Sequence, residues 1–164
     1  MIQFKNHKRK DIPYRIKWLN NSKADVFASD KDNKTTRAKQ IKWFDDYEKN
    51  RNKKFFTICD ESKPIGFMGF LKMDKINKKA EIFIMIGDGN YRGRGWGKES
   101  LKYLIDYGFE KLKLKKVYLG VYESNKSAIF CYESVGFKVE GVFKKDAFFS
   151  VKYHSLVMMA IFKN

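Results

Sequence analysis

The chain has 164 residues, 43% of them apolar and 16% aromatic, which is a globular and not a disordered composition. This length suits one domain, so residues 1–164 are treated as a single unit. No apolar stretch approaches the roughly 20 residues that a membrane-spanning helix needs, and the charged N-terminus does not resemble a signal peptide. Cys59 and Cys131 match no metal-binding spacing. These features predict a cytoplasmic protein with reduced thiols, no metal and no membrane partner.

The formal net charge is +16, which raises nucleic acid, a membrane surface or a phosphorylated ligand as partners. Arginine occurs only six times, so 29 of the 35 basic residues are lysine. Arginine is the residue that base-edge and bidentate phosphate recognition favour. The charge therefore indicates a lysine-rich surface, and a nucleic-acid partner is not expected.

Hydrophobic patterns along the chain predict an α/β (α+β) domain, a mixed sheet with helices on its faces. The third predicted strand is apolar on both faces and is therefore expected at the centre of the sheet. The predicted elements are, in order, helices at 11–21 and 36–50, strands at 55–60, 65–73 and 80–87, a helix ending near Leu112, a strand at 116–122, a helix ending at Gly136, and strands at 137–146 and 153–162.

A glycine-rich stretch, "NYRGRGWGKE" (90–99), joins the third predicted strand to the next helix. The first turn of a helix has unpaired N–H groups and the positive end of the dipole, and glycines let a diphosphate approach the backbone. A turn with basic residues facing water is the simpler alternative. A P-loop needs Ser or Thr where Glu99 stands, and a dinucleotide fingerprint needs glycine at Lys98. The predicted diphosphate-binding residues are Arg92, Gly93, Arg94, Gly95, Trp96, Gly97 and Lys98.

The order R-x-x-G-x-G from Arg92 to Gly97 resembles the pyrophosphate-binding motif of the GNAT (Gcn5-related) N-acetyltransferases. The segment "SNKSAIFCYESVGF" is similar to the downstream motif of that family, through Asn125, Ala128, Tyr132, Gly136 and Phe137. With the preceding strand, the resemblance covers residues 65–142. The segments "IKWLNN" and "QIKWF" look like its RimJ/RimL-type or nucleotide-sugar branches.

This resemblance implies a mostly antiparallel central sheet whose fourth and fifth strands splay apart, with "IQF" as the first strand. It also implies acetyl-CoA as co-substrate, its pantetheine arm lying between the splayed strands. Backbone groups of Met85, Ile86 and Gly87 would pair with that arm, and an amide N–H there can bind the oxyanion. Asn125 would contact the arm as well, although an asparagine at a helix start is also an ordinary cap.

Two side chains are the catalytic candidates. Tyr132 matches the tyrosine that protonates the departing thiolate in the family; an unperturbed phenol has a pKa of about 10, above the roughly 8.5 of a thiol. Packing in the core is its other interpretation. Glu81 is the charged residue in an apolar strand and is the candidate base. It could instead bind the positive charge of the amine, or lie at the solvated entrance of the strand.

The sequence therefore predicts transfer of an acetyl group from acetyl-CoA to a primary amine, by direct attack in a ternary complex. Trp43 and Phe44 are candidates for the wall of the acceptor site, or for the core. A protein N-terminus or a nucleotide-linked amino sugar is the favoured acceptor, with a polyamine disfavoured by the basic surface and an antibiotic also considered. The alternative is a non-catalytic basic domain that binds RNA or coenzyme A. Homodimers are common in the family.

Overall fold

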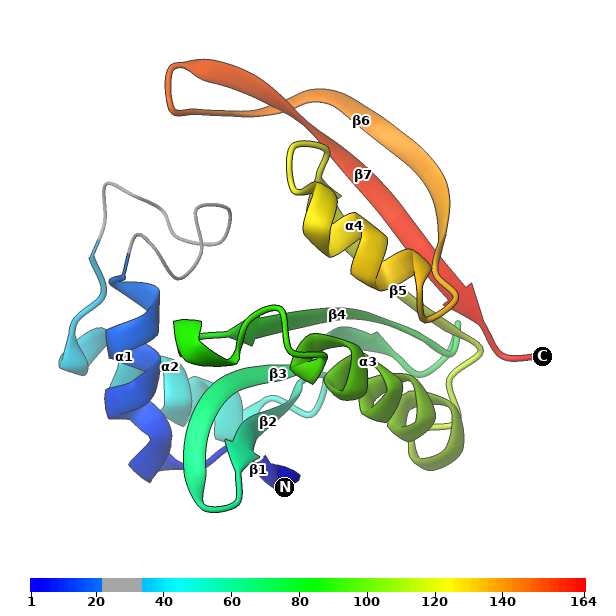
Figure 1. Ribbon diagram of the computed structural model, residues 1–164. Coiled ribbons are helices and arrows are strands. Elements are labelled where there is room, and N and C mark those ends of the chain that lie inside the picture. The colour runs from blue at the N-terminus through cyan, green and yellow to red at the C-terminus, as the bar shows by residue number, and fades with distance from the viewer. Residues whose placement is uncertain (22–33) are drawn as a thin grey trace.

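The computed structural model describes residues 1–21 and 34–164. Within them, seven strands form one sheet in the order β1-β2-β3-β4-β5-β7-β6, with helices on both faces (Figure 1). Neighbouring strands are antiparallel except for β4 and β5, which are parallel. The strands are β1 Ile2–Asn6, β2 Lys54–Asp60, β3 Lys63–Asp74, β4 Lys79–Ile86, β5 Lys116–Tyr122, β6 Lys138–Phe149 and β7 Lys152–Phe162. The predicted fold class is confirmed, including a first strand at "IQF".

Three of the helices begin at residues that favour a helix start. Pro13 lies in the first turn of α1, the side chain of Thr36 accepts from the N–H of Lys39 in α2, and Asn125 caps α4. The predicted helix to Leu112 changes into a π-helix after Asp106. The helices are α1 Ile12–Leu19, α2 Arg37–Lys49, α3 Trp96–Asp106 and α4 Lys126–Glu133, with short 3-10 helices η1 Arg9–Asp11 and η2 Gly89–Tyr91 and the π-helix η3 Tyr107–Lys111.

Hydrophobic packing gives the sheet two different faces. On one face, Leu101 and Leu104 of α3 are buried against strand residues such as Phe70. On the opposite face, Trp18 of α1 packs against Phe67 of β3 in a smaller cluster. Because side chains alternate along a regular strand, the two clusters show which face the positions of β4 take: Ile82 belongs to the α3 side and Met85 to the α1 side. Any cavity that crosses the sheet therefore receives side chains from both sides.

The parallel contact between β4 and β5 is short, and this creates an opening in the sheet. The two strands pair through only three positions, the last being Glu81 with Tyr118. Beyond them, β4 stays paired with β3 as far as Ile86, and β5 with β7 as far as Tyr122. Figure 1 shows β5, β6 and β7 diverging from β1–β4, with α4 beside β5 and β7. The predicted splay of the fourth and fifth strands is confirmed.

The end of β4 is held against α1 by a close approach at Gly87. A Cβ atom at this position would overlap the indole ring of Trp18, which is 4% exposed. We expect Gly87→Ala to lower the free energy of unfolding by about 1–3 kcal/mol, because the buried indole must shift. Urea unfolding measures this. Gly89→Ala is the control, since a Cβ there meets no atom within 4 Å, and an equal loss in both variants would contradict the explanation.

Candidate active site

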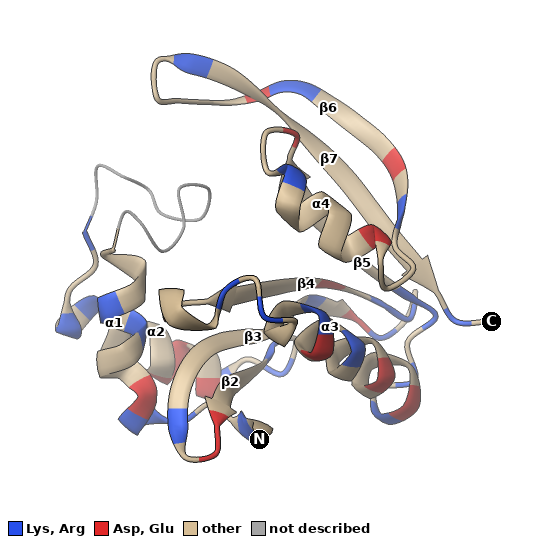
Figure 2. Ribbon diagram, viewed as in Figure 1, with Lys and Arg blue, Asp and Glu red and all other residues tan. Residues whose placement is uncertain are grey.

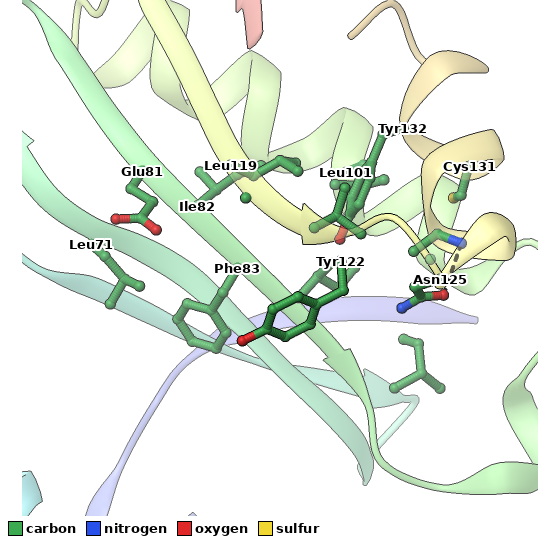
Figure 3. Close-up of a pocket in the computed structure, with 16 residues that line it drawn as sticks. Leu71, Glu81, Ile82, Phe83, Leu101, Leu119, Tyr122, Asn125, Cys131 and Tyr132 are labelled. Carbon is green, nitrogen blue, oxygen red and sulfur yellow. Dashed lines mark hydrogen bonds between the residues drawn. The ribbon is translucent and has the colours of Figure 1, made fainter. Parts of the chain in front are cut away.

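A cavity of about 300 Å³ lies where β4 and β5 separate (Figure 3). Its walls come from β4, β5 and the helices α3 and α4, with Leu71 from β3. Most of the lining is apolar, with a few polar side chains facing the same space, as in typical ligand sites. The polar and aromatic side chains of the lining are Glu81, Phe83, Tyr122, Asn125, Cys131 and Tyr132.

The cavity joins the two faces of the sheet. Ile82 of β4 belongs to the core cluster on the α3 face, so its neighbours Glu81 and Phe83 lie on the α1 face. By the same alternation, Tyr122 of β5 lies on that face, because Val121 is in the α3-side core. Asn125 and Tyr132 approach from α4 on the other side. A ligand held between the strands would therefore meet different chemistry on its two sides.

The backbone of β4 offers hydrogen-bonding groups to this cavity at alternate residues. The N–H of Gly87 donates to the carbonyl of Ile65 in β3, at 2.9 Å. Successive residues direct their N–H and C=O groups to opposite neighbours, so Ile84 and Ile86 face the β5 side. Met85 also belongs to the β3 side, and its side chain packs with Trp18. Of the three predicted backbone positions, Met85, Ile86 and Gly87, only Ile86 therefore faces the gap. Ile84, which was not predicted, faces it as well.

The glycine-rich stretch has the backbone geometry of a turn that only glycine adopts easily. Gly93 and Gly95 have φ of 69° and 84°, in the left-handed region, with open space around both Cβ positions. Gly95 is the N-cap of α3, and no side chain caps that end of the helix. A Cβ at Gly97 would lie 3.8 Å from the Sγ of Cys131, so this end of α3 lies against α4. The first-turn N–H groups of α3 are therefore available to a ligand.

The basic residues of this stretch have different environments. The guanidinium of Arg92 donates from Nε and Nη2 to the carbonyl of Ile86, at 3.1 and 3.0 Å, and so ties the loop to the end of β4. Arg94 and Lys98 are exposed and line a hollow of about 420 Å³ beside the start of α3, together with Trp96. Both can add positive charge next to the first turn of that helix.

Helix α4 brings three polar groups to the cavity. The hydroxyl of Tyr132 points from α4 towards Leu101 and the gap between the strands (Figure 3), and its ring lies edge-on to Phe137 at a centroid separation of 5.9 Å. Asn125 accepts from the N–H of Ala128 at 3.3 Å, so it is a helix cap that also lines the cavity. Burial raises the pKa of the Cys131 thiol.

Glu81 lies in the last β4–β5 pair, at the closed end of the gap. Of the described residues that line the cavity, it is the one acidic side chain. Its Oε2 atom is 2.8 Å from the Nζ atom of Lys72, and hydrogen bonding to Glu81 raises the pKa of that lysine. Figure 3 shows Glu81 and Asn125 at opposite ends of the lining.

Two predicted acceptor residues lie outside the lining of this cavity. Phe44 is 3% exposed, and the ring of Trp43 stacks on Phe55 at 5.3 Å with the guanidinium of Arg15 over it at 3.7 Å. Both belong to a packed aromatic cluster, which was the other interpretation open from the sequence. Phe83 and Tyr122 are aromatic side chains that do line the cavity on this face. Phe83 could have been found from the sequence, because it lies two residues from Glu81 in the same strand and so points to the same face.

Neither histidine belongs to a cluster of metal-ligand side chains within the part of the chain that the structure describes. His7 is buried with its Nδ1 atom 2.8 Å from Thr57 Oγ1, and burial lowers its pKa to about 4. The Thr57 hydroxyl donates to Asp11 at 2.8 Å. Over residues 1–21 and 34–164, no three His, Cys, Asp or Glu side chains gather as a metal site requires. No helix in the same ranges has the length and apolarity of a membrane span.

Comparison with known proteins relates this chain to acetyltransferases. The model of the acetyltransferase (GNAT) family matches residues 15–137. The spermidine N(1)-acetyltransferase of Escherichia coli K12 is 33% identical over 112 residues, which cover 68% of this chain and 59% of that protein. The enzyme of the same name from Vibrio cholerae is 30% identical over 115 residues, 70% of this chain and 66% of the relative. These alignments therefore span less than two thirds of either relative.

The fold is also similar to that of a solved structure. A Vibrio cholerae spermidine N-acetyltransferase in complex with CoA and spermine superposes with a TM-score of 0.90 at 23% identity, covering 98% of this chain and 95% of that one. The predicted RimJ/RimL-type or nucleotide-sugar branch is not supported, because the two relatives named above are spermidine acetyltransferases. Trp18 and Trp43, which lie in the segments that suggested the branch, pack in the core and in an aromatic cluster.

Proposed function

This chain belongs to the acetyltransferase (GNAT) family, and on that premise we propose that it acetylates a primary amine of a polyamine such as spermidine, with acetyl-CoA as donor. The observation that supports this most is the cavity between β4 and β5, with the start of α3 at one end and Glu81 at the other. When bound, acetyl-CoA supplies a thioester. Everything else in the reaction is binding, orientation and proton transfer by the chain.

The residues present fit such a ligand. The first-turn N–H groups of α3 and the left-handed Gly93 and Gly95 form a cradle for a diphosphate, with Arg94 and Lys98 adding charge. Arg92 holds this cradle at a fixed position relative to β4. The backbone of Ile84, facing the gap, can pair with amide groups as a neighbouring strand would, and its N–H can bind a developing oxyanion.

Two side chains are placed to move protons. Tyr132 donates the proton of its hydroxyl to the departing sulfur, because it reaches the gap from α4. Glu81 lies across the sheet from it, on the α1 face at the closed end of the gap, where the acceptor amine is proposed to bind. An amine must be neutral to attack, so a carboxylate at this point can take its proton or hold its charge before the transfer.

The relatives and the position of Glu81 support a polyamine as the acceptor. This proposal replaces our expectation that a net positive charge would disfavour a polyamine. A net charge of +16 describes the whole chain, whereas charges farther apart than about 8–10 Å are largely screened at physiological ionic strength. What a bound cation meets is the local carboxylate. In Figure 2 the basic residues are spread over most elements with acidic ones among them, which does not favour the alternative of an RNA-binding surface.

The proposal is tested by titrating the protein with acetyl-CoA in a calorimeter, followed by a thiol-release assay. Spermidine, spermine, an N-terminal peptide and a nucleotide-linked amino sugar are offered as acceptors at equal concentration. We expect saturable binding and turnover with the two polyamines at the highest kcat/KM. Turnover of the peptide or the sugar alone would contradict the acceptor class. Absence of acetyl-CoA binding would contradict the whole proposal.

The role of Glu81 predicts a pH-dependent loss of activity. We expect Glu81→Gln to lower kcat/KM about 100-fold near pH 7 and much less near pH 10, where the amine begins to lose its proton without help. Turnover across this pH range, with Glu140→Gln as the control, measures the effect; Glu140 pairs with Lys116 and does not line the cavity. An equal loss at every pH would contradict the role of Glu81 as a base, and would indicate that it only binds the positive charge of the amine.

A further inference from the structure

Lys72 pairs with Glu81, although a side chain at its position in a regular strand would point to the other face of the sheet. Leu71 pairs with Glu81 and lines the cavity, so regular alternation would direct Lys72 to the opposite face. Between the pair Leu71–Glu81 and the pair Asp74–Lys79, β3 has one residue more than β4, which is a β-bulge. Lys72 lies in that bulge with φ of 45°. The bulge therefore turns the lysine back towards the carboxylate.

Lys78, Lys113 and Lys145 also have positive φ, so it is the bulge beside the cavity that distinguishes Lys72. A non-glycine residue with positive φ is uncommon, and bulges occur near active sites where they redirect a side chain. The Nζ atom lies 2.8 Å from Glu81 Oε2, while the Lys72 side chain is 74% exposed and that of Glu81 is 23% exposed. One partner is thus sheltered and fixed in a strand, and the other can swing into water.

We propose that Lys72 is a built-in competitor for the acceptor: its ammonium occupies the position beside Glu81 that the ammonium of an incoming polyamine takes. This inference rests on the proposed function and names a specificity-determining residue for it. Exchange of one ammonium for another keeps the carboxylate compensated at every stage. A neutral or anionic acceptor offers no such compensation. Lys72 thereby selects for cationic acceptors while weakening the binding of each.

The decisive variant is Lys72→Asn. Asparagine tolerates positive φ, carries no charge and is too short to replace the lysine beside Glu81. Lys72→Arg keeps a cation in place. Lys102→Gln removes one positive charge from a surface pair with Glu99, whose atoms are 3.0 Å apart, and so controls for net charge.

We expect Lys72→Asn to lower the calorimetric Kd and the KM for spermidine about two- to fivefold, which is the range of an exposed ion pair, with kcat within about twofold. Lys72→Arg and Lys102→Gln should match the wild type. In a Glu81→Gln background the effect of Lys72→Asn should vanish, because the competition requires the carboxylate.

Three results would overturn the inference: an unchanged Kd in Lys72→Asn, a raised Kd, or the same decrease in Lys102→Gln. A raised Kd would mean that Lys72 positions Glu81 for the acceptor. Acetyl-CoA affinity and circular dichroism report whether each variant is folded. If the wild type acetylates spermidine while Lys72→Asn behaves like the wild type, only the competition fails. If the wild type neither binds nor acetylates any polyamine, the proposed function fails and the competition fails with it.

Discussion

Replacing Tyr132 with Phe is expected to lower kcat about 100- to 1,000-fold, while the Kd for acetyl-CoA stays within about twofold of the wild type. The change removes one hydroxyl from a ring that stays packed edge-on to Phe137. The cavity lining is otherwise preserved, so binding is retained. What is lost is the proton for the departing sulfur, which is needed only as the thioester breaks. The interaction thus belongs to the transition state and appears in kcat.

Stopped-flow or steady-state thiol release measures kcat, and calorimetry measures the Kd of the same variant. Tyr153→Phe is the matched control, because it removes a tyrosine hydroxyl from a side chain that is 62% exposed on β7. A wild-type kcat in Tyr132→Phe would remove this residue as the proton donor. The hydroxyl of Tyr122, which also lines the cavity, would be tested next.

The arrangement of elements could be predicted because local signals and fold agree. The alternation of apolar residues, the caps at Thr36 and Asn125, and the glycines before α3 each indicate one backbone conformation. The splayed strands came from the family resemblance. The π-helix after Asp106 was missed, because local pattern does not show that Gly108 packs closely against Phe70, which is distant in sequence.

The details of the site depend on the direction in which each residue of a strand faces, and a continuous run of apolar residues does not reveal that direction. In β4, apolar residues occupy both faces, so the sequence could not decide between Met85 and Ile84 for the backbone that faces the gap. The Lys72–Glu81 pair was missed for a related reason, because the bulge that joins them interrupts the alternation. The sequence also left Trp43 open between the acceptor wall and the core, and its ring is covered by Phe55 and Arg15.

Gly95→Glu is expected to weaken acetyl-CoA binding about 100-fold or more. A carboxylate at the N-cap of α3 would occupy the space where the diphosphate is proposed to bind, and it would repel the negative charge of that group. The charged hydrogen bonds lost in this way are worth about 1.5–3 kcal/mol. The φ of 84° at this position costs about 1–2 kcal/mol for any residue with a Cβ, and this cost lowers affinity when the free loop relaxes to another φ and must return to bind. A factor of 100 corresponds to about 2.7 kcal/mol, which these two effects reach together. An acidic side chain at a helix N-terminus favours the empty protein, so unfolding is not the expected cause.

Two controls separate the contributions, and calorimetric titration with acetyl-CoA compares all three variants. Gly95→Ala introduces the same backbone strain without the charge, and we expect at most about a tenfold loss. Gly141→Glu adds the same charge on β6, where a Cβ meets no atom within 4 Å, and should bind like the wild type. If Gly95→Ala and Gly95→Glu lose equally, strain alone accounts for the effect. If Gly95→Glu binds normally, the diphosphate lies away from the first turn of α3 and from the hollow that Gly95 lines together with Arg94 and Lys98.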